Sequence, residues 1–294
     1  MVATSRVPPH LYFVVGAVFH YTGPAFAVLL FVQLDPLGVV WLRIASAALV
    51  LALWRRPWRV WPRLARQTRR TLVLWGAVLA IMNACFYLSI GALPLGTVAA
   101  IEFVPVVALA ALGVRSWRNG SAVVLAAAGA YLLIELQLSG QPVGVLLAAA
   151  NAVLFAAYVL VGHHVSRIEG LSGIDALALS MLIATVLSSP LCLWSAVPAF
   201  TDPRLLAAAV GIGICSSVVP YVADQLAMRQ VDRATYALMV SLLPATATVV
   251  GILVLTQLPT PTEVVGVLLV IAGITVHAEA VRPTSPAPVS RAEA

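Results

Sequence analysis

The sequence predicts an all-α integral membrane protein with ten transmembrane helices, arranged as two inverted five-helix repeats. Three observations support this fold class: an apolar composition, ten apolar spans, and an uneven distribution of arginines between the connecting segments. Of the 294 residues, 62% are hydrophobic and 10% are charged, and the mean hydropathy is +1.01. Soluble domains are roughly 45–50% apolar. A soluble globule could not bury this much apolar surface.

The apolar residues gather in ten spans, each long enough to cross a bilayer. The hydrocarbon core is about 30 Å thick, and an α-helix crosses it with about 20 residues. In chain order, the predicted spans are 11–32, 36–54, 71–91, 95–114, 121–138, 143–162, 174–197, 204–223, 234–256 and 262–281.

Arginine placement predicts the orientation, because cytoplasmic segments near helix ends accumulate arginine and lysine. With the N-terminus inside, fifteen of the seventeen arginines fall in cytoplasmic segments: Arg6, Arg55, Arg56, Arg59, Arg63, Arg66, Arg69, Arg70, Arg115, Arg118, Arg167, Arg229, Arg233, Arg282 and Arg291. Arg204 faces the other side, and Arg43 lies within a span. A missed or extra helix would destroy this alternation. We therefore expect an even number of spans and both termini in the cytoplasm.

The two ends of the chain need separate interpretations. A signal peptide is an alternative to the first span, because Arg6 precedes an apolar run and Ala25-Phe26-Ala27 mimics a cleavage site. The apolar run continues beyond that point, which favours a transmembrane helix. Residues 282–294 are rich in Pro, Ser and Ala, and we expect a disordered cytoplasmic tail.

An internal repeat divides the spans into residues 1–139 and 140–281, each a repeat of five helices. The run IEFVPVVALAALGV at 101–114 parallels VSLLPATATVVGIL at 240–253, and AAAGAYLL at 126–133 parallels VIAGITVH at 270–277. An odd number of spans in each half places the second half upside down relative to the first. Inverted repeats recur among secondary transporters, whose substrate site lies near the midplane between the repeats.

Several other functional classes lack the residues they need. All basic residues are arginine, so a Walker phosphate loop, which needs a lysine, is absent, and we expect no use of ATP. The formal charge of +6 is spread over short segments between apolar spans, so we expect no nucleic-acid partner. Cys85, Cys192 and Cys215 lie in apolar spans without metal-ligand spacing, which predicts packing residues, no metal and no cofactor.

Three stretches carry a resemblance to a known family. They are WLRIASAALVLAL at 41–53, the Arg-Arg-Pro-Trp turn at 55–58, and NACFYLSIGALPLGTVAAIEFVPVVAL at 83–109. Over residues 11–281 the chain resembles the EamA-type transporters of the drug/metabolite transporter superfamily, most of all the threonine/homoserine exporters. The resemblance implies a ten-helix fold and proton-driven export of amino acids or related metabolites. Leu243 stands where such exporters often carry a glutamate.

Two buried charges are the first candidates for a substrate site. An ionisable side chain deep in the bilayer costs about 2.5–3.5 kcal/mol on insertion scales, so Arg43 and Glu102 require an explanation. Each lies seven residues into its predicted span, roughly 10 Å below the outer boundary. A static ion pair between helices is one interpretation. The other is a zwitterion site, in which Arg43 binds a carboxylate and Glu102 binds an ammonium group.

Five further residues complete the predicted site. His20 lies near the middle of the first span and could exchange protons, although a lone histidine more often only packs between helices. Asn83 and Asn151 could hydrogen-bond a ligand or a neighbouring helix. Pro105 and Pro244 should each free a carbonyl and kink a helix, which would expose polar backbone to a cavity.

These observations together predict a secondary transporter in the cytoplasmic membrane that exports amino acids or related metabolites. We expect it to work by alternating access, with export coupled to the movement of protons. Export or import of another metabolite or a drug is the main alternative. A membrane enzyme would need clustered acidic or histidine residues near an interface, and none is apparent in the sequence. A scaffold would have no reason to place Arg43, Glu102 and His20 at depth.

Overall fold

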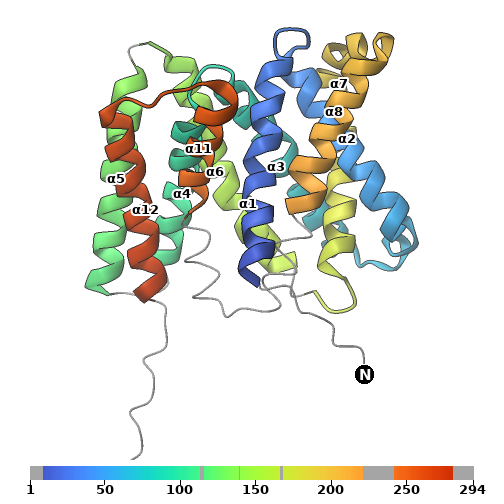
Figure 1. Ribbon diagram of the computed structural model, residues 1–294. Helices are drawn as coiled ribbons and strands as arrows, with labels where there is room; N and C mark the ends of the chain where they lie inside the picture. Colours follow the sequence, from blue (N-terminus) through green and yellow to red (C-terminus); the bar gives the residue numbers. More distant parts are fainter. Residues whose placement is uncertain (1–8, 113–115, 139, 166–167, 221–241, 281–294) are drawn as a thin grey trace, which may run out of the picture.

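The computed structural model describes residues 9–112, 116–138, 140–165, 168–220 and 242–280, and these form a bundle of helices that lie roughly parallel or antiparallel to one another (Figure 1). The helices are α1 (Pro9–Leu30), α2 (Pro36–Arg55), α3 (Arg66–Ile90), α4 (Leu95–Leu112), α5 (Trp117–Leu138), α6 (Pro142–Val165), α7 (Gly173–Thr201), α8 (Pro203–Gly213), α11 (Leu243–Leu255) and α12 (Pro261–Ala280). A π-helical turn, η3 (Ile214–Val218), extends α8, and two 3₁₀ turns, η1 (Pro57–Arg59) and η2 (Trp61–Arg63), precede α3.

Five of these helices, α2, α3, α5, α6 and α7, are long and apolar enough to cross a membrane. Shorter apolar helices cover Val14–Leu30, Leu95–Pro105, Pro203–Val218, Leu243–Leu255 and Pro261–Val276. The chain is therefore a multi-pass membrane protein. Each predicted span overlaps one of these helices. Parts of the predicted spans 204–223 and 234–256 lie outside the described residues.

The bounds of α2 show how local sequence sets a helix. Asp35 caps the start, because its Oδ1 accepts a hydrogen bond from Leu37 N at 2.8 Å, and Pro36 fits the first helical position. At the other end, Arg56 adopts a left-handed conformation with φ 50°, and its N–H bonds to Ala52 O. The chain therefore turns sharply where the apolar span ends.

The helices within residues 9–138 pack against those within residues 140–280. α2 lies against α7, α4 against α11 and α5 against α12. Several other contacts occur in matching sets: α1 with α11 and α6 with α4; α2 with α8 and α7 with α3; α1 with α8 and α6 with α3. Counting by predicted span, each of these contacts has a counterpart five spans away or is its own counterpart. The contact of α4 with α12, in contrast, has no comparable counterpart between α5 and α11 in the described part of the chain.

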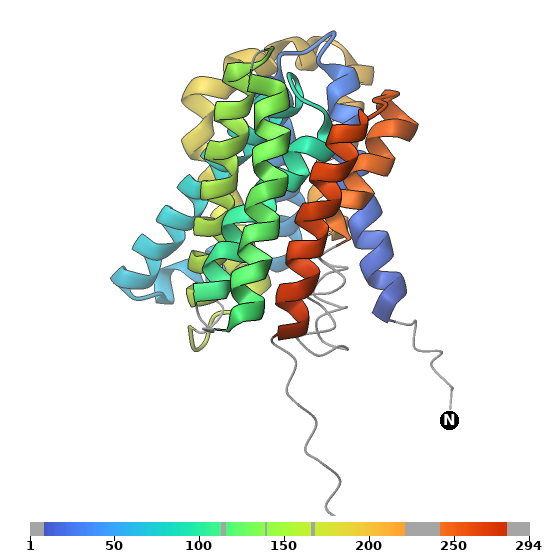
Figure 2. The same ribbon diagram turned by 90° about the vertical axis from the view of Figure 1, so that its left-hand side faces the viewer.

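The interface between α5 and α12 is reciprocal in its residues. A Cβ placed on Gly129 would lie 2.5 Å from Gly266 O and 2.9 Å from a Val270 methyl group. A Cβ placed on Gly273 would lie 2.7 Å from Ala122 O and 2.9 Å from Ala126 N. The two helices run antiparallel side by side, which both views show (Figures 1 and 2). Glycine is needed at both places because the backbones touch.

The two ends of the bundle differ in their charge. α1 begins and α12 ends at the same end, where the arginine-rich stretch between α2 and α3 also lies (Figure 1). At this end Arg55 Nε donates to Asp175 Oδ1 at 2.8 Å, which ties the end of α2 to the start of α7. The opposite end carries short connections such as those from α1 to α2, α3 to α4 and α11 to α12.

Candidate functional site

Arg43 lies in the middle of α2 with only 9% of its surface exposed, and every nitrogen of its guanidinium has a partner. Nε donates to Ser216 Oγ at 2.7 Å, and Nη2 donates to the Ser216 carbonyl oxygen at 3.3 Å. Nη1 donates to Asn83 Oδ1. Three distant parts of the chain, α2, α3 and η3, therefore meet at one cation.

The α3 side of this cluster holds the guanidinium in place. Asn83 is buried, and its Nδ2 donates to Leu79 O at 2.8 Å, which orients its oxygen toward Arg43. The Tyr87 ring, fully buried one turn further along α3, lies 5.2 Å from Arg43 Cζ and forms a cation–π contact. We call Arg43, Asn83, Tyr87 and Ser216 the basic cluster.

The third side of the basic cluster is the π-helical turn η3. Ser216 Oγ accepts from Arg43 and itself donates to Ile212 O at 2.7 Å. Two glycines let neighbouring helices approach: a Cβ on Gly23 of α1 would overlap the Ser216 side chain, and one on Gly213 would lie 2.8 Å from Arg43 O. π-helical turns are rare and occur often at functional sites.

Glu102 of α4 forms a second cluster with Asn151 of α6. Both are buried, and Asn151 Nδ2 donates to Glu102 Oε1 at 3.1 Å. Asn151 Oδ1 has no hydrogen-bond partner among the described residues, and neither has the buried Tyr21 hydroxyl of α1. Glu102 is within electrostatic range of Tyr21. We call Glu102 and Asn151 the acidic cluster.

The structure does not pair Arg43 directly with Glu102. Both residues are described, yet the ion pair found in the described part of the chain joins Arg55 and Asp175. Arg43 still interacts electrostatically with Glu102 and with His20, a partly buried residue of α1 whose ring lies 5.0 Å from that of Tyr21. The predicted residues thus form two clusters of opposite charge, with His20 and Tyr21 near them.

The two prolines differ in their positions. Pro105 is inside α4, as expected, in a half-buried position. Pro244 is buried at the first turn of α11, so it does not interrupt the described helix, and the residues before Leu242 lie outside the described part. Whether either proline lines a cavity stays a prediction.

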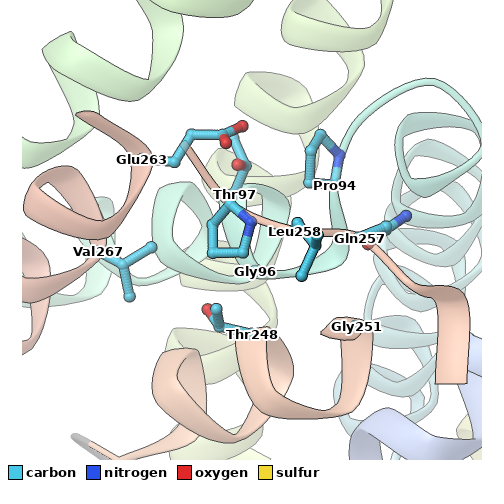
Figure 3. A pocket seen from close by; sticks show the side chains of 10 residues that line it. Pro94, Gly96, Thr97, Thr248, Gly251, Gln257, Leu258, Glu263 and Val267 are labelled. Atoms are coloured by element: carbon cyan, nitrogen blue, oxygen red, sulfur yellow. The ribbon is translucent and has the colours of Figure 1, made fainter. Parts of the chain in front are cut away.

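A small pocket lies at the end of the bundle opposite the arginine-rich stretch (Figure 3). It is lined by Pro94, Gly96, Thr97, Thr248, Gly251, Gln257, Leu258, Pro259, Glu263 and Val267. Gln257 Oε1 accepts from Leu95 N at 3.0 Å, so the segment before α12 caps the start of α4.

Glu263, on the edge of this pocket, is a buried carboxylate that sequence reasoning missed. Its Oε2 accepts from Thr260 N at 2.7 Å, Thr260 Oγ1 accepts from Glu263 N at 3.3 Å, and its Oε1 accepts from Gln137 Nε2 at 2.8 Å. The spacing Thr-Pro-Thr-Glu at 260–263 is a capping box, so it could have been found from the sequence. Its satisfied oxygens indicate a structural role.

Ser216, Tyr87 and Tyr21 were also missed, for a different reason. Serine and tyrosine are common in transmembrane helices, so no local pattern distinguishes a residue beside a buried charge. Only knowledge of which helices touch could have selected them.

Comparison with known proteins gives concordant results. The model of the EamA-like transporter family matches residues 142–278. The threonine/homoserine exporter RhtA of Escherichia coli K12 is 30% identical over 256 residues, covering 85% of this chain and 84% of the exporter. The exporter of the same name from Salmonella typhimurium LT2 is 30% identical over 254 residues, with the same coverage.

A protein of known crystal structure has a similar fold. It aligns with a TM-score of 0.58 and 17% sequence identity, over 93% of this chain and 99% of that protein. At this identity the likeness concerns the fold alone.

Proposed function

Because the chain belongs to the EamA-like transporter family, we propose that it exports amino acids or related small metabolites across the cytoplasmic membrane, driven by protons. The family membership points to a membrane transporter rather than an enzyme. The substrate class, the membrane and the coupling ion are our proposal.

The observation that carries the proposal is the pair of buried clusters of opposite charge. Arg43 in the basic cluster and Glu102 in the acidic cluster come from α2 and α4 and interact without direct contact. A zwitterionic amino acid carries both complementary charges, a carboxylate for the guanidinium and an ammonium group for Glu102. A static ion pair would have placed the two side chains in contact with each other.

Unpartnered polar atoms near Glu102 support a substrate with a further polar group. Tyr21 Oη and Asn151 Oδ1 are buried and lack partners among the described residues. Such atoms cost free energy unless a ligand or water satisfies them. Threonine and homoserine, after which the relatives are named, carry a hydroxyl that can donate or accept a hydrogen bond.

Proton coupling is assigned to Glu102 and His20. Both can change charge by binding a proton, and both are within electrostatic range of Arg43. A proton on Glu102 would remove the charge that attracts an ammonium group. Protonation and substrate binding at this carboxylate therefore exclude each other, which is what an exchange of proton for substrate requires.

We further propose that the fold is ten helices in two inverted repeats, residues 1–139 and 140–281, followed by a tail at 282–294. The matching helix contacts and the reciprocal packing of α5 on α12 support this division. Gly129 and Gly273 occupy equivalent places in the repeated motifs. Gly129 lies against Gly266 and Val270, and Gly273 lies against the corresponding residues of the first motif's helix, Ala122 and Ala126. Such symmetry favours alternating access around a site between the halves.

The proposed orientation has both termini in the cytoplasm. The start of α1, the end of α12 and the arginine-rich stretch lie at one end of the bundle, which supports it.

Another metabolite or a drug remains the alternative cargo. An apolar pocket between α1 and α8, lined by residues that include Phe19, Phe26 and Ile212, favours this alternative, because it could accept a hydrophobic compound. It does not contain Arg43 or Glu102, whose charges suit a zwitterion better.

Transport by purified protein in liposomes tests the proposal. The protein should move labelled threonine or homoserine against a concentration gradient when a proton gradient is imposed, and a proton ionophore should abolish this accumulation. In cells, overexpression should raise resistance to inhibitory amino-acid analogues. Transport of drugs but no amino acid would overturn the amino-acid assignment, and accumulation without a proton gradient would overturn the coupling.

A further inference from the structure

The contacts of Arg43 with Ser216 resemble those that an arginine makes with a carboxylate. Nε and Nη2 share one edge of the guanidinium, and they donate to Ser216 Oγ at 2.7 Å and to Ser216 O at 3.3 Å. Carboxylates bind arginine through two parallel hydrogen bonds to such an edge. The two oxygens of Ser216 therefore occupy the places that the two oxygens of a bound carboxylate would take.

We infer that Ser216 is a built-in competitor for the substrate carboxylate and so couples substrate binding to the conformation of η3. The inference rests on the proposed function, and it assigns a positioning residue that the sequence pattern does not indicate. When a carboxylate binds Arg43 through this edge, Ser216 must leave it, since Nε has a single N–H and that N–H already donates to Ser216 Oγ.

The release of Ser216 changes the environment of the whole turn. In the structure, Arg43 bonds both the side chain and the backbone carbonyl of Ser216, which lies at the centre of Ile214–Val218. π-helical turns are rare and occur mostly as single turns within α-helices. Loss of both bonds therefore favours a rearrangement at this turn, where α1, α2 and α8 meet.

The close packing around the turn transmits this change to other helices. Ser216 is 1% exposed and its Cβ lies against Gly23 of α1, while Gly213 lies against Ser46 and the Arg43 backbone of α2. A shift of the turn cannot occur without movement of at least one of these helices. Substrate binding at Arg43 would thereby loosen the contact between helices of the two halves.

The expected consequence is a Ser216→Ala protein that binds substrate more tightly and moves it no faster. With the hydroxyl removed, the carboxylate no longer displaces the bond to Nε, so KM for threonine should fall about tenfold, equivalent to about 1.4 kcal/mol. The kcat should stay equal or fall. If Ser216 had only a structural role, the KM of Ser216→Ala would instead rise or stay unchanged.

Matched variants make this comparison specific. Ser217→Ala removes a buried hydroxyl from the same turn, but this residue is not a partner of Arg43, so its KM should equal that of the wild type. Ser216→Cys keeps the side chain's shape with a weaker acceptor, and its KM should lie between those of the wild type and Ser216→Ala.

Hydrogen–deuterium exchange of the peptide that contains residues 214–218 provides a second measurement. In the wild type, exchange should be slow without substrate and faster with saturating threonine. In Ser216→Ala it should already be faster without substrate, whereas Ser217→Ala should behave as the wild type.

The outcomes separate the two proposals. If the wild type transports threonine or homoserine but Ser216→Ala has an unchanged or higher KM, the competitor role is wrong while the proposed function stands. If no amino acid is transported, the proposed function fails. The competitor role is then overturned as well if exchange at 214–218 is the same in Ser216→Ala and wild type.

Discussion

Each buried charge near the centre of this protein is held by uncharged polar neighbours. Arg43 bonds to a serine and an asparagine, and Glu102 bonds to an asparagine. Neutral partners relieve part of the cost of burial without cancelling the charge. A ligand of opposite charge therefore still gains from binding there, which distinguishes a binding site from a closed ion pair.

Substitution of Glu102 by Gln should separate transport from folding. Glutamine keeps the size of the side chain and can still bond Asn151, so we expect near-normal amounts of protein in the membrane. Transport should fall to background, because the amide can neither attract an ammonium group nor take up a proton. Transport assays with quantified membrane protein provide the measurement.

An exposed carboxylate serves as the control for this variant. Glu135→Gln changes the same chemical group on the outside of α5 and should leave transport unchanged. Normal transport by Glu102→Gln would remove Glu102 from the site. Loss of the protein from the membrane would instead indicate a structural carboxylate.

Substitution of Arg43 by Lys should also impair transport. A lysine ammonium is a point charge that cannot bind two oxygens along a planar edge. The loss of one charge-assisted hydrogen bond contributes about 1.5–3 kcal/mol, so kcat/KM should fall at least about tenfold. Arg55→Lys, at the ion pair with Asp175, is the matched control and should transport normally. Wild-type kcat/KM in Arg43→Lys would contradict carboxylate binding at Arg43.

Sequence alone predicted that Arg43 and Glu102 are buried but not what they contact, and it missed the buried Glu263. Arg43 and Glu102 stand out because they interrupt apolar spans, and the cost of burial makes them informative. Their similar depth allowed either an ion pair or a shared substrate site, because depth says nothing about rotation around a helix axis. The partner Ser216 is distant in sequence and chemically ordinary for a membrane helix.

Among the helices, the predicted spans and the observed elements agree best where a local signal marks the end. For α2, Asp35 and Pro36 mark the start and the basic pair Arg55 and Arg56 marks the end. The start of α3 at Arg66 precedes the predicted residue 71, because an arginine-rich first turn continues the helix beyond the apolar core. The π-helical turn of Ile214–Val218 could not be predicted, since it depends on contacts with α1 and α2.

The reciprocal interface of α5 and α12 makes a testable prediction about stability. In Gly129→Ala the new methyl group would meet the backbone oxygen of Gly266 at 2.5 Å, which side-chain rotation cannot relieve. Overpacking of this kind costs about 1–3 kcal/mol. We therefore expect a lower melting temperature in detergent.

Gly120 on the same helix is the control, because a Cβ there would meet nothing within 4 Å. Gly120→Ala should melt at the same temperature or higher, since alanine favours helix. Equal melting temperatures for Gly129→Ala and wild type would mean that the close contact is not present in the membrane.

For the whole molecule, the arginine distribution predicts the direction of insertion. Single cysteines placed between α2 and α3, and tags on the C-terminal tail, should be protected from a membrane-impermeant reagent in intact cells. A cysteine at Gln257 or Leu258, at the other end of the bundle, should react. Labelling of both ends from outside, or of neither, would contradict the proposed orientation.

The packing of α5 on α12 also bears on how such a molecule could arise. Gly129 touches Gly266 and Val270, and Gly273 touches Ala122 and Ala126. The contact face of α5 would therefore also fit a second copy of the same helix that runs in the opposite direction. A half-length ancestor with this face could pair two molecules inserted in opposite directions. After duplication and fusion, each copy could diverge independently. On the proposed division, Arg43 and Glu102 lie in the first repeat and Ser216 in the second, so the proposed site is shared unequally while the joining face stays alike.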